Sequence, residues 1–199
     1  MSFSHLDHAI LAEGRRQGLR LQKFKRTSGL PRVQRVLGIL RGFHPASLLD
    51  VGSGRGAFLW PVLDAFPGLR VVAIDHSPRR VEDIAAVHRG SVVTLSALRA
   101  DAHWIPLASA SQDVVTLLEV LEHLHSPSAA VAEAIRVAGR AVVLSVPSRA
   151  DNNPEHIHLF DGKQIEALFL EGGATKVRCE FVCCATARSW RWASAPSSR

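Results

Sequence analysis

Residues 48–56 read Leu48-Leu49-Asp50-Val51-Gly52-Ser53-Gly54-Arg55-Gly56, and four apolar residues follow at 57–60. A short apolar run that ends at an acid, three alternating glycines and a second apolar run predict a strand, a tight turn and the start of a helix. Glycine permits positive φ and lets a bound molecule approach the backbone closely. These residues therefore predict a ligand-binding turn at the carboxyl end of a buried strand.

A second apolar run ends at an acid further along the chain. It reads Val71-Val72-Ala73-Ile74-Asp75 and lies about 20 residues after the last glycine of the turn. Nucleoside-binding folds place the acceptor of the ribose hydroxyls at this position. Two strands that each end at an acid favour a turn that binds a nucleoside-like ligand over a glycine-rich surface loop that binds nothing.

Apolar runs of strand length alternate with helical patterns through most of the chain. Strands are expected near 47–51, 70–75, 92–98, 113–119 and 140–146, and helices near 55–66, 78–89, 127–138 and 161–171. Such alternation predicts an α/β fold with parallel strands covered on both faces. A further helix is expected from Pro31, with a regular apolar face.

The composition of the 199 residues is that of one globular domain. Three cysteines crowded near one end predict neither a disulfide framework nor a paired zinc site. No apolar run is long enough to span a membrane, and the first residues lack the pattern of a secretory signal. We therefore expect a cytoplasmic protein with reduced thiols.

The positive charge is concentrated at the N-terminus. Residues 1–45 hold nine Lys or Arg against two acidic residues, whereas the whole chain has a net charge of +6. We expect 1–45 to form a basic helical lid, 46–187 to form the ligand-binding domain, and 188–199 to form a disordered tail. A basic face such as that of Arg32, Arg35 and Arg41 is either solvated or in contact with phosphates.

Residues 46–181 resemble the class I S-adenosylmethionine-dependent methyltransferases. The resemblance rests on Asp50-x-Gly52-x-Gly54-x-Gly56, Asp75, Asp101-Ala102 and Leu118-Glu119. It implies a Rossmann-like, mostly parallel seven-stranded sheet in the order 3-2-1-4-5-7-6, with a reversed last hairpin. It also implies S-adenosylmethionine as the cofactor.

The resemblance assigns roles to individual residues. The glycine turn would meet the methionine part, Asp75 would accept both ribose hydroxyls, Asp101 would bind the adenine amino group, and His76 would lie against the adenine ring. The expected cofactor residues are Asp50, Gly52, Ser53, Gly54, Gly56, Asp75, His76, Asp101, Ala102 and Glu119.

A nicotinamide-binding domain is the nearest alternative for the same residues. Its turn normally runs G-x-G-x-x-G, so that the helix N-terminus can hold a pyrophosphate. In this chain the spacing is G-x-G-x-G. The turn therefore favours a ligand without pyrophosphate.

A second group of polar residues follows the fourth and fifth strands. It comprises Glu119-Val120-Leu121-Glu122-His123 and His158-Leu159-Phe160. His123 or His158 could be a general base. Alternatively, Glu119, Glu122, His123 and His158 could hold Mg²⁺ or another divalent ion, as the resemblance to ubiquinone-pathway O-methyltransferases and small-RNA 2′-O-methyltransferases implies. In the third interpretation, Glu122 and His123 only orient the loop. The candidate catalytic residues are His123, Glu122 and His158.

The predicted function is methyl transfer from S-adenosylmethionine to an oxygen or nitrogen of a small molecule. One alternative is an RNA ribose 2′-O-methyltransferase that uses the N-terminal arginines to follow the phosphates. The other is a module that binds the cofactor without catalysis. The sequence does not predict an oligomeric state.

Overall fold

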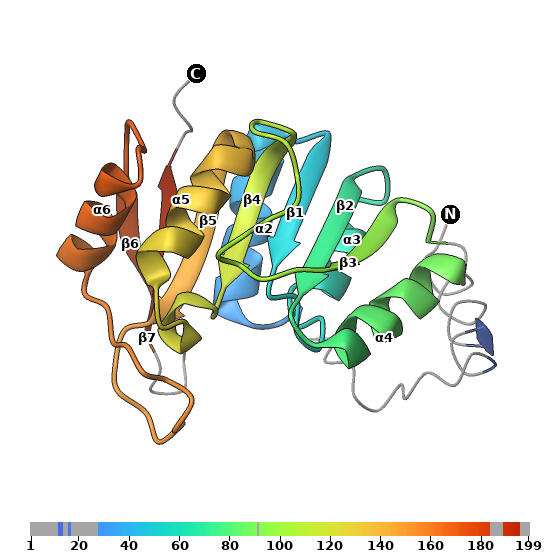
Figure 1. Ribbon diagram of the computed structural model, residues 1–199, viewed down its shortest axis with the longest axis horizontal. Coiled ribbons are helices and arrows are strands. Elements are labelled where there is room, and N and C mark those ends of the chain that lie inside the picture. The colour runs from blue at the N-terminus through green and yellow to red at the C-terminus, as the bar shows by residue number, and fades with distance from the viewer. Residues whose placement is uncertain (1–11, 14–15, 17–27, 91, 184–188, 196–199) are drawn as a thin grey trace.

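The computed structural model describes residues 12–13, 16, 28–90, 92–183 and 189–195. Their centre is a seven-stranded sheet in the order β3-β2-β1-β4-β5-β7-β6, which confirms the predicted order (Figure 1). Five strands are parallel: β1 (Ser47–Val51), β2 (Arg70–Asp75), β3 (Leu95–Arg99), β4 (Gln112–Leu118) and β5 (Ala138–Pro147). The last two, β6 (Arg178–Cys183) and β7 (Ser189–Ala195), form an antiparallel hairpin.

Helices cover both faces of the sheet. On one face α2 (Pro31–Phe43), α3 (Leu59–Ala65) and α4 (Pro78–Arg89) pack against one core cluster. On the other face α5 (Pro127–Val137) and α6 (Gly162–Glu171) pack against a second cluster. Neighbouring residues of β1 divide between the clusters, with Leu48 in the first and Leu49 in the second. The central strand is therefore buried on both sides, as its unbroken apolar sequence predicts.

Helix α2 belongs to this packed body, which corrects the predicted boundary at residue 46. Its residues Val33, Val36, Leu37 and Leu40 are at most 3% exposed and lie in the core. In addition, Arg35 forms a bidentate ion pair with Glu180 of β6. An amphipathic helix gains most of its stability by burying its apolar face, so α2 packs on the sheet instead of forming part of a lid. Most of residues 1–30 lie outside the described residues, and for them the lid stays a prediction.

Strand β7 corrects the expectation that residues 188–199 form a tail without regular structure. Residues 189–195 pair with β5 on one side and with β6 on the other. Backbone groups on both sides of the strand are thereby hydrogen-bonded. The local sequence did not indicate this strand because its stability comes from partners far away in the chain.

The carboxyl ends of β1 to β5 meet at one edge of the sheet, the lower edge in Figure 1. The loops at this edge contain the glycine turn after β1, the segment around Glu119 and Glu122 after β4, and the long loop after β5. In open α/β sheets, ligands bind at this edge. In the part of the chain that the structure describes, no helix has the length and apolar character needed to cross a membrane.

Candidate active site

The glycine turn has the backbone that its sequence predicts. Gly52, Gly54 and Gly56 have φ values of +69°, +57° and +77°, in the region that side chains disfavour. A Cβ on Gly54 would meet no protein atom closer than 3.6 Å, so the space beside this glycine is open to a ligand. At Gly52 the space is already filled, because a Cβ there would lie 2.6 Å from Cγ2 of Val120.

Gly56 has a packing role. A Cβ on this residue would lie 1.9 Å from Nε1 of Trp60, whose indole N–H donates a hydrogen bond to the carbonyl of Arg55 at 3.2 Å. The indole therefore occupies the space beside the third glycine, where α3 begins. A pyrophosphate at the start of this helix would need that space, which argues against a dinucleotide ligand.

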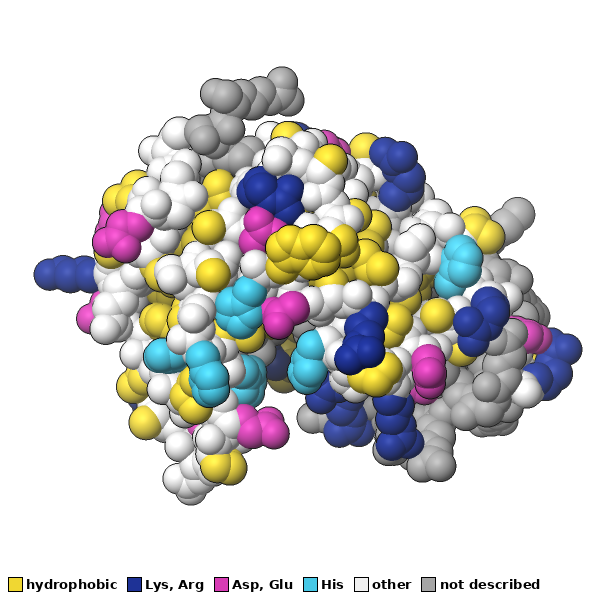
Figure 2. All heavy atoms as spheres, viewed as in Figure 1, with side chains coloured by type: hydrophobic (Ala, Val, Ile, Leu, Met, Phe, Trp, Pro, Cys, Tyr) yellow, Lys and Arg dark blue, Asp and Glu magenta, His cyan; other side chains and the backbone are white. Residues whose placement is uncertain are grey.

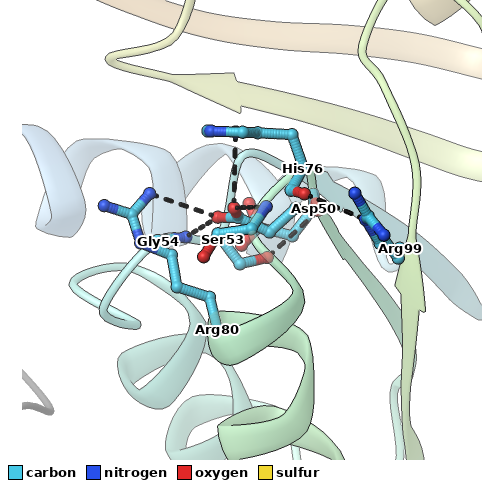
Figure 3. A network of polar contacts seen from close by, with 8 residues as sticks. Asp50, Ser53, Gly54, His76, Arg80 and Arg99 are labelled. Atoms are coloured by element: carbon cyan, nitrogen blue, oxygen red, sulfur yellow. Dashed lines mark hydrogen bonds and ion pairs between the residues drawn. The ribbon is translucent and has the colours of Figure 1, made fainter.

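Asp75 joins the end of β2 to the glycine turn (Figure 3). Its side chain is 1% exposed, Oδ2 accepts the N–H of Gly54 at 2.9 Å, and Oδ1 accepts the N–H of Ser77 at 2.9 Å. Two exposed side chains also approach the carboxylate: Arg80 Nη1 lies 3.5 Å from Oδ2, and His76 Nδ1 lies 3.5 Å from Oδ1. The predicted ribose acceptor is thus fixed by backbone donors beside the turn.

Asp50 lies buried beneath the turn. One carboxylate oxygen accepts a hydrogen bond from the Thr116 hydroxyl at 2.8 Å, and the Ser53 hydroxyl donates to the backbone carbonyl of Asp50 at 3.1 Å. Burial raises the pKa of Asp50 to about 6, although the hydrogen bonds oppose this rise. This acid connects β1 and β4 below the candidate ligand space.

Asp101 and Ala102 follow β3, as predicted. Oδ1 of Asp101 accepts both the backbone N–H of His103 at 2.9 Å and its ring Nδ1–H at 2.6 Å. These contacts, led by the backbone hydrogen bond, lower the pKa of Asp101. The side chains of Asp101 and His76 are 66% and 83% exposed, so the proposed adenine end of the site is open to solvent.

The segment after β4 has little regular structure. Of residues 119–123, only Leu121–His123 form a short 3₁₀ turn. Glu119 lies before this turn in a left-handed conformation with φ of +61°. Its carboxylate accepts the Ser145 hydroxyl at 2.7 Å, and its N–H donates to the Ser145 carbonyl at 2.9 Å. Glu119 is therefore tied to β5.

Glu122 is fully buried, and neither carboxylate oxygen has a hydrogen-bond partner among the residues that the structure describes. Burial, with repulsion from Glu119 as the next cause, raises the pKa of Glu122 to about 9. Its backbone carbonyl accepts the N–H groups of Ile157 at 2.9 Å and His158 at 3.2 Å. The side chain is thus a buried polar group beneath the loop after β5.

Histidines connect this loop to the 3₁₀ turn, and Figure 2 shows them gathered beside a notch in the molecular outline. Nδ1 of His123 lies 2.9 Å from the carbonyl of Glu155, and Nε2 of His158 lies 2.9 Å from the carbonyl of Leu124. Because a carbonyl can only accept, these two ring nitrogens carry the protons. Each ring therefore keeps its other nitrogen as an acceptor when neutral.

His156 is a residue that the sequence interpretation missed. Its Nδ1 lies 3.0 Å from Oδ1 of Asp151, and its ring packs edge-on against His123 with centroids 4.7 Å apart. His156 and Asp151 lie in the loop after β5, where the sequence interpretation selected only His158 as a site residue. Only the folded loop brings them to the 3₁₀ turn.

Two of the four predicted metal ligands, Glu122 and His123, belong to a cluster of potential ligands that the structure forms. Glu119 is bound to Ser145, and one ring nitrogen of His158 is bound to Leu124. Among the described residues, Glu122, His123 and His156 have potential ligand atoms within 4.8 Å of one another.

The arginines of α2 were considered above as possible contacts for phosphates. Arg35 pairs with Glu180, and the guanidinium of Arg41 lies 6.0 Å from the centroid of the Phe66 ring. At least two of the three arginines thus have partners within the protein.

The strand order, the glycine turn and the buried acid after β2 all agree with the fold that the sequence resemblance implies. Residues 49–144 match the family model described as a methyltransferase domain. The matched residues form a methyltransferase domain. The matched residues include the glycine turn, Asp75 and Asp101, but end before the histidine-containing loop after β5.

Two curated relatives of this methyltransferase domain are both malonyl-[acyl-carrier protein] O-methyltransferases. The one from Hahella chejuensis is 38% identical over 102 residues, which cover 51% of this chain and 36% of the relative. The one from Geobacter sulfurreducens is 30% identical over 107 residues, which cover 53% and 40%. The chain thus spans well under half the length of either relative.

Among solved structures, the methyltransferase domain resembles magnesium protoporphyrin IX methyltransferase from Synechocystis with bound S-adenosylhomocysteine. The TM-score is 0.66 at 19% identity, and the match covers 84% of this chain and 82% of that one. This likeness shows the shared fold.

Proposed function

We propose that the domain transfers a methyl group from S-adenosylmethionine to an oxygen atom of a small acid held as a thioester. The observation that carries this proposal is the buried Asp75 carboxylate, which is fixed to the N–H of Gly54 at 2.9 Å. It supplies ribose-hydroxyl acceptors next to a turn whose Gly54 leaves room for a ligand. The residues present therefore fit an adenosyl cofactor, and the names of the curated relatives support the acceptor.

The cofactor supplies an activated methyl group on a positively charged sulfur. When bound, it would give this methyl group to an acceptor oxygen, and the electron pair of the broken carbon–sulfur bond would stay on sulfur. The chain's own contribution is alignment: Asp75 would hold the ribose and the glycine turn the methionine part, while the loops after β4 and β5 border the acceptor.

The acceptor decides whether a base is needed. A free carboxylate has already lost its proton near neutral pH, so its methylation needs no general base. A hydroxyl acceptor would need one, and the remaining ring nitrogen of His123 or His158 is available for it. If the acceptor is a carboxylate, Glu122 and His123 only support the loop.

The site also fits a divalent ion, with a donor set that differs from the predicted one. Glu122, His123 and His156 offer one carboxylate and two imidazoles, and Nδ1 of each imidazole is oriented by a backbone carbonyl or a carboxylate. Such outer contacts are common around metal-bound histidines. If an ion binds there, ionisation of the buried Glu122 accompanies binding, and calorimetry in two buffers of different ionisation enthalpy would detect the released proton. Equal heats in both buffers, or no binding, would remove the ion from the proposal.

The test of the main proposal combines binding with turnover. Titration with S-adenosylhomocysteine should show one binding site, and incubation with S-adenosylmethionine and malonyl-acyl-carrier protein should give a methyl ester detectable by mass spectrometry. Absence of binding at about millimolar ligand would overturn the proposal. Binding without any methylated acid or alcohol would favour the non-catalytic module, and methylated RNA would favour the ribose alternative.

A further inference from the structure

The surface around Asp75 carries more positive charge than the proposed cofactor explains. Four arginines follow or end the first three strands, and we call them the arginine rim: Arg55, Arg79, Arg80 and Arg99. All four are exposed. Figure 2 shows Lys and Arg side chains gathered on the other side of the notch from the histidines.

The rim is held at the mouth of the candidate cofactor site. Arg80 Nη1 lies 3.5 Å from the Asp75 carboxylate, and Nε of Arg99 donates to the backbone carbonyl of His76 at 3.3 Å. Figure 3 shows Arg80 and Arg99 on two sides of this loop. Arg80 and Arg99 therefore border the space proposed for the ribose and adenine.

The adenosyl half of S-adenosylmethionine has no phosphate or carboxylate to match this charge. Asp75 partners Arg80, and the other acid at this mouth, Asp101, is engaged by His103. Among the residues that the structure describes, Arg79 and Arg99 form no ion pair with an acidic side chain. The rim thus retains guanidinium groups for a partner other than the cofactor.

The position of two rim arginines also has an electrostatic cost. Arg79 and Arg80 lie in the first turn of α4, and that turn contains no acidic residue. Cations are unfavourable at a helix N-terminus because the helix dipole is positive there. Departures from such local rules are expected where a surface binds something.

We propose that the arginine rim docks an acidic protein that carries the methyl acceptor, which rests on the function proposed above. The rim extends over three loops, so it matches a surface with several carboxylates, to which guanidinium groups can bind with two hydrogen bonds each. The named substrate of both curated relatives is joined to a carrier protein, and this favours a protein over RNA as the polyanion.

The test uses an unloaded, negatively charged acyl-carrier protein and measures its binding to the full chain by fluorescence anisotropy. Arg79→Glu and Arg99→Glu should each weaken binding by about tenfold, and binding to the unchanged chain should fall as salt rises from about 50 to about 200 mM. Arg89→Glu, in the last turn of the same helix, is the matched control and should leave binding within about twofold.

Affinity for S-adenosylhomocysteine is measured in parallel and should be unchanged in Arg79→Glu. Carrier binding that is absent, or equal in all variants, overturns the docking proposal while leaving the proposed function intact. A single-stranded RNA that binds the rim more tightly than the carrier also overturns it, in favour of nucleic acid. Loss of S-adenosylhomocysteine binding by the unchanged chain would instead refute the function on which the proposal rests.

Discussion

Gly52 and Val120 are so close that Gly52 has no room for a side chain: a Cβ there would lie 2.6 Å from Cγ2 of Val120. This contact locks the turn after β1 against the segment after β4. We predict that Gly52→Ala destabilises the protein by about 1–3 kcal/mol, from the clash and from the positive φ of 69°. Urea denaturation measures the change.

A double-mutant cycle separates the two causes. Val120→Ala in the Gly52→Ala background should recover the part due to the clash and leave the part due to φ. Gly38→Ala in α2 is the control, because nothing lies within 4 Å of its Cβ position and alanine favours a helix by roughly 0.5–1 kcal/mol. Equal stability of Gly52→Ala and the unchanged protein would contradict this description of the turn.

The Asp75 carboxylate is expected to carry much of the cofactor affinity. Asp75→Asn should weaken S-adenosylhomocysteine binding by about 1–3 kcal/mol, because the amide group loses the charge and one acceptor oxygen. Isothermal titration calorimetry measures this loss, and a melting curve checks the fold. Asp83→Asn, on the following helix, serves as control; an identical affinity in all three proteins would rule out the ribose role.

Glu122 predicts a dependence of stability on pH. Its pKa is about 9 in the folded protein against an ordinary value of 4.5, so between these values the folded state binds more protons than the unfolded chain. The free energy of unfolding therefore falls as pH rises through this window. Glu122→Gln should remove this dependence and be more stable than the unchanged protein at pH ~8, by about 1–3 kcal/mol.

Denaturation at several pH values checks the Glu122 prediction. The exposed Glu166→Gln in α6 changes the same chemical group without affecting the buried site. If the two variants follow the same pH profile, Glu122 is not the source of the dependence.

His158 is expected to fasten the loop after β5. His158→Phe removes the hydrogen bond from Nε2 to the Leu124 carbonyl, which is 2.9 Å long, and should cost about 1 kcal/mol. The amide of Ile157, which donates to Glu122, should then exchange with deuterium faster. Unchanged exchange, or equally fast exchange in His125→Phe, would show that the loop is held by other contacts.

The cofactor half of the site was predictable because its signals are local. Asp50 and Asp75 each end an apolar run, and the glycines between them require positive φ at 52, 54 and 56. A parallel sheet then brings these strand ends together without further information.

The acceptor half was not predictable because its contacts join distant segments. The positions of Glu119, Glu122 and His123 depend on a backbone that turns left-handed at Glu119 and then forms only a short 3₁₀ turn. His156 reaches the ring of His123 from the loop after β5, about 30 residues further along the chain. Strand β7 was missed for the same reason, since its partners lie outside its own sequence neighbourhood.

The position of β7 between β5 and β6 also imposes an order on folding. β6 pairs with β7 and has no pairing with β5, so it has no place in the sheet until the ribosome has made β7. Until then β5 presents an unpaired edge, which is a site for pairing with other chains. The hairpin of β6 and β7 can form first as a local unit and then add to β5. Completion of the sheet is therefore a late step in folding. The nascent chain is most prone to aggregation just before the hairpin covers the edge of β5.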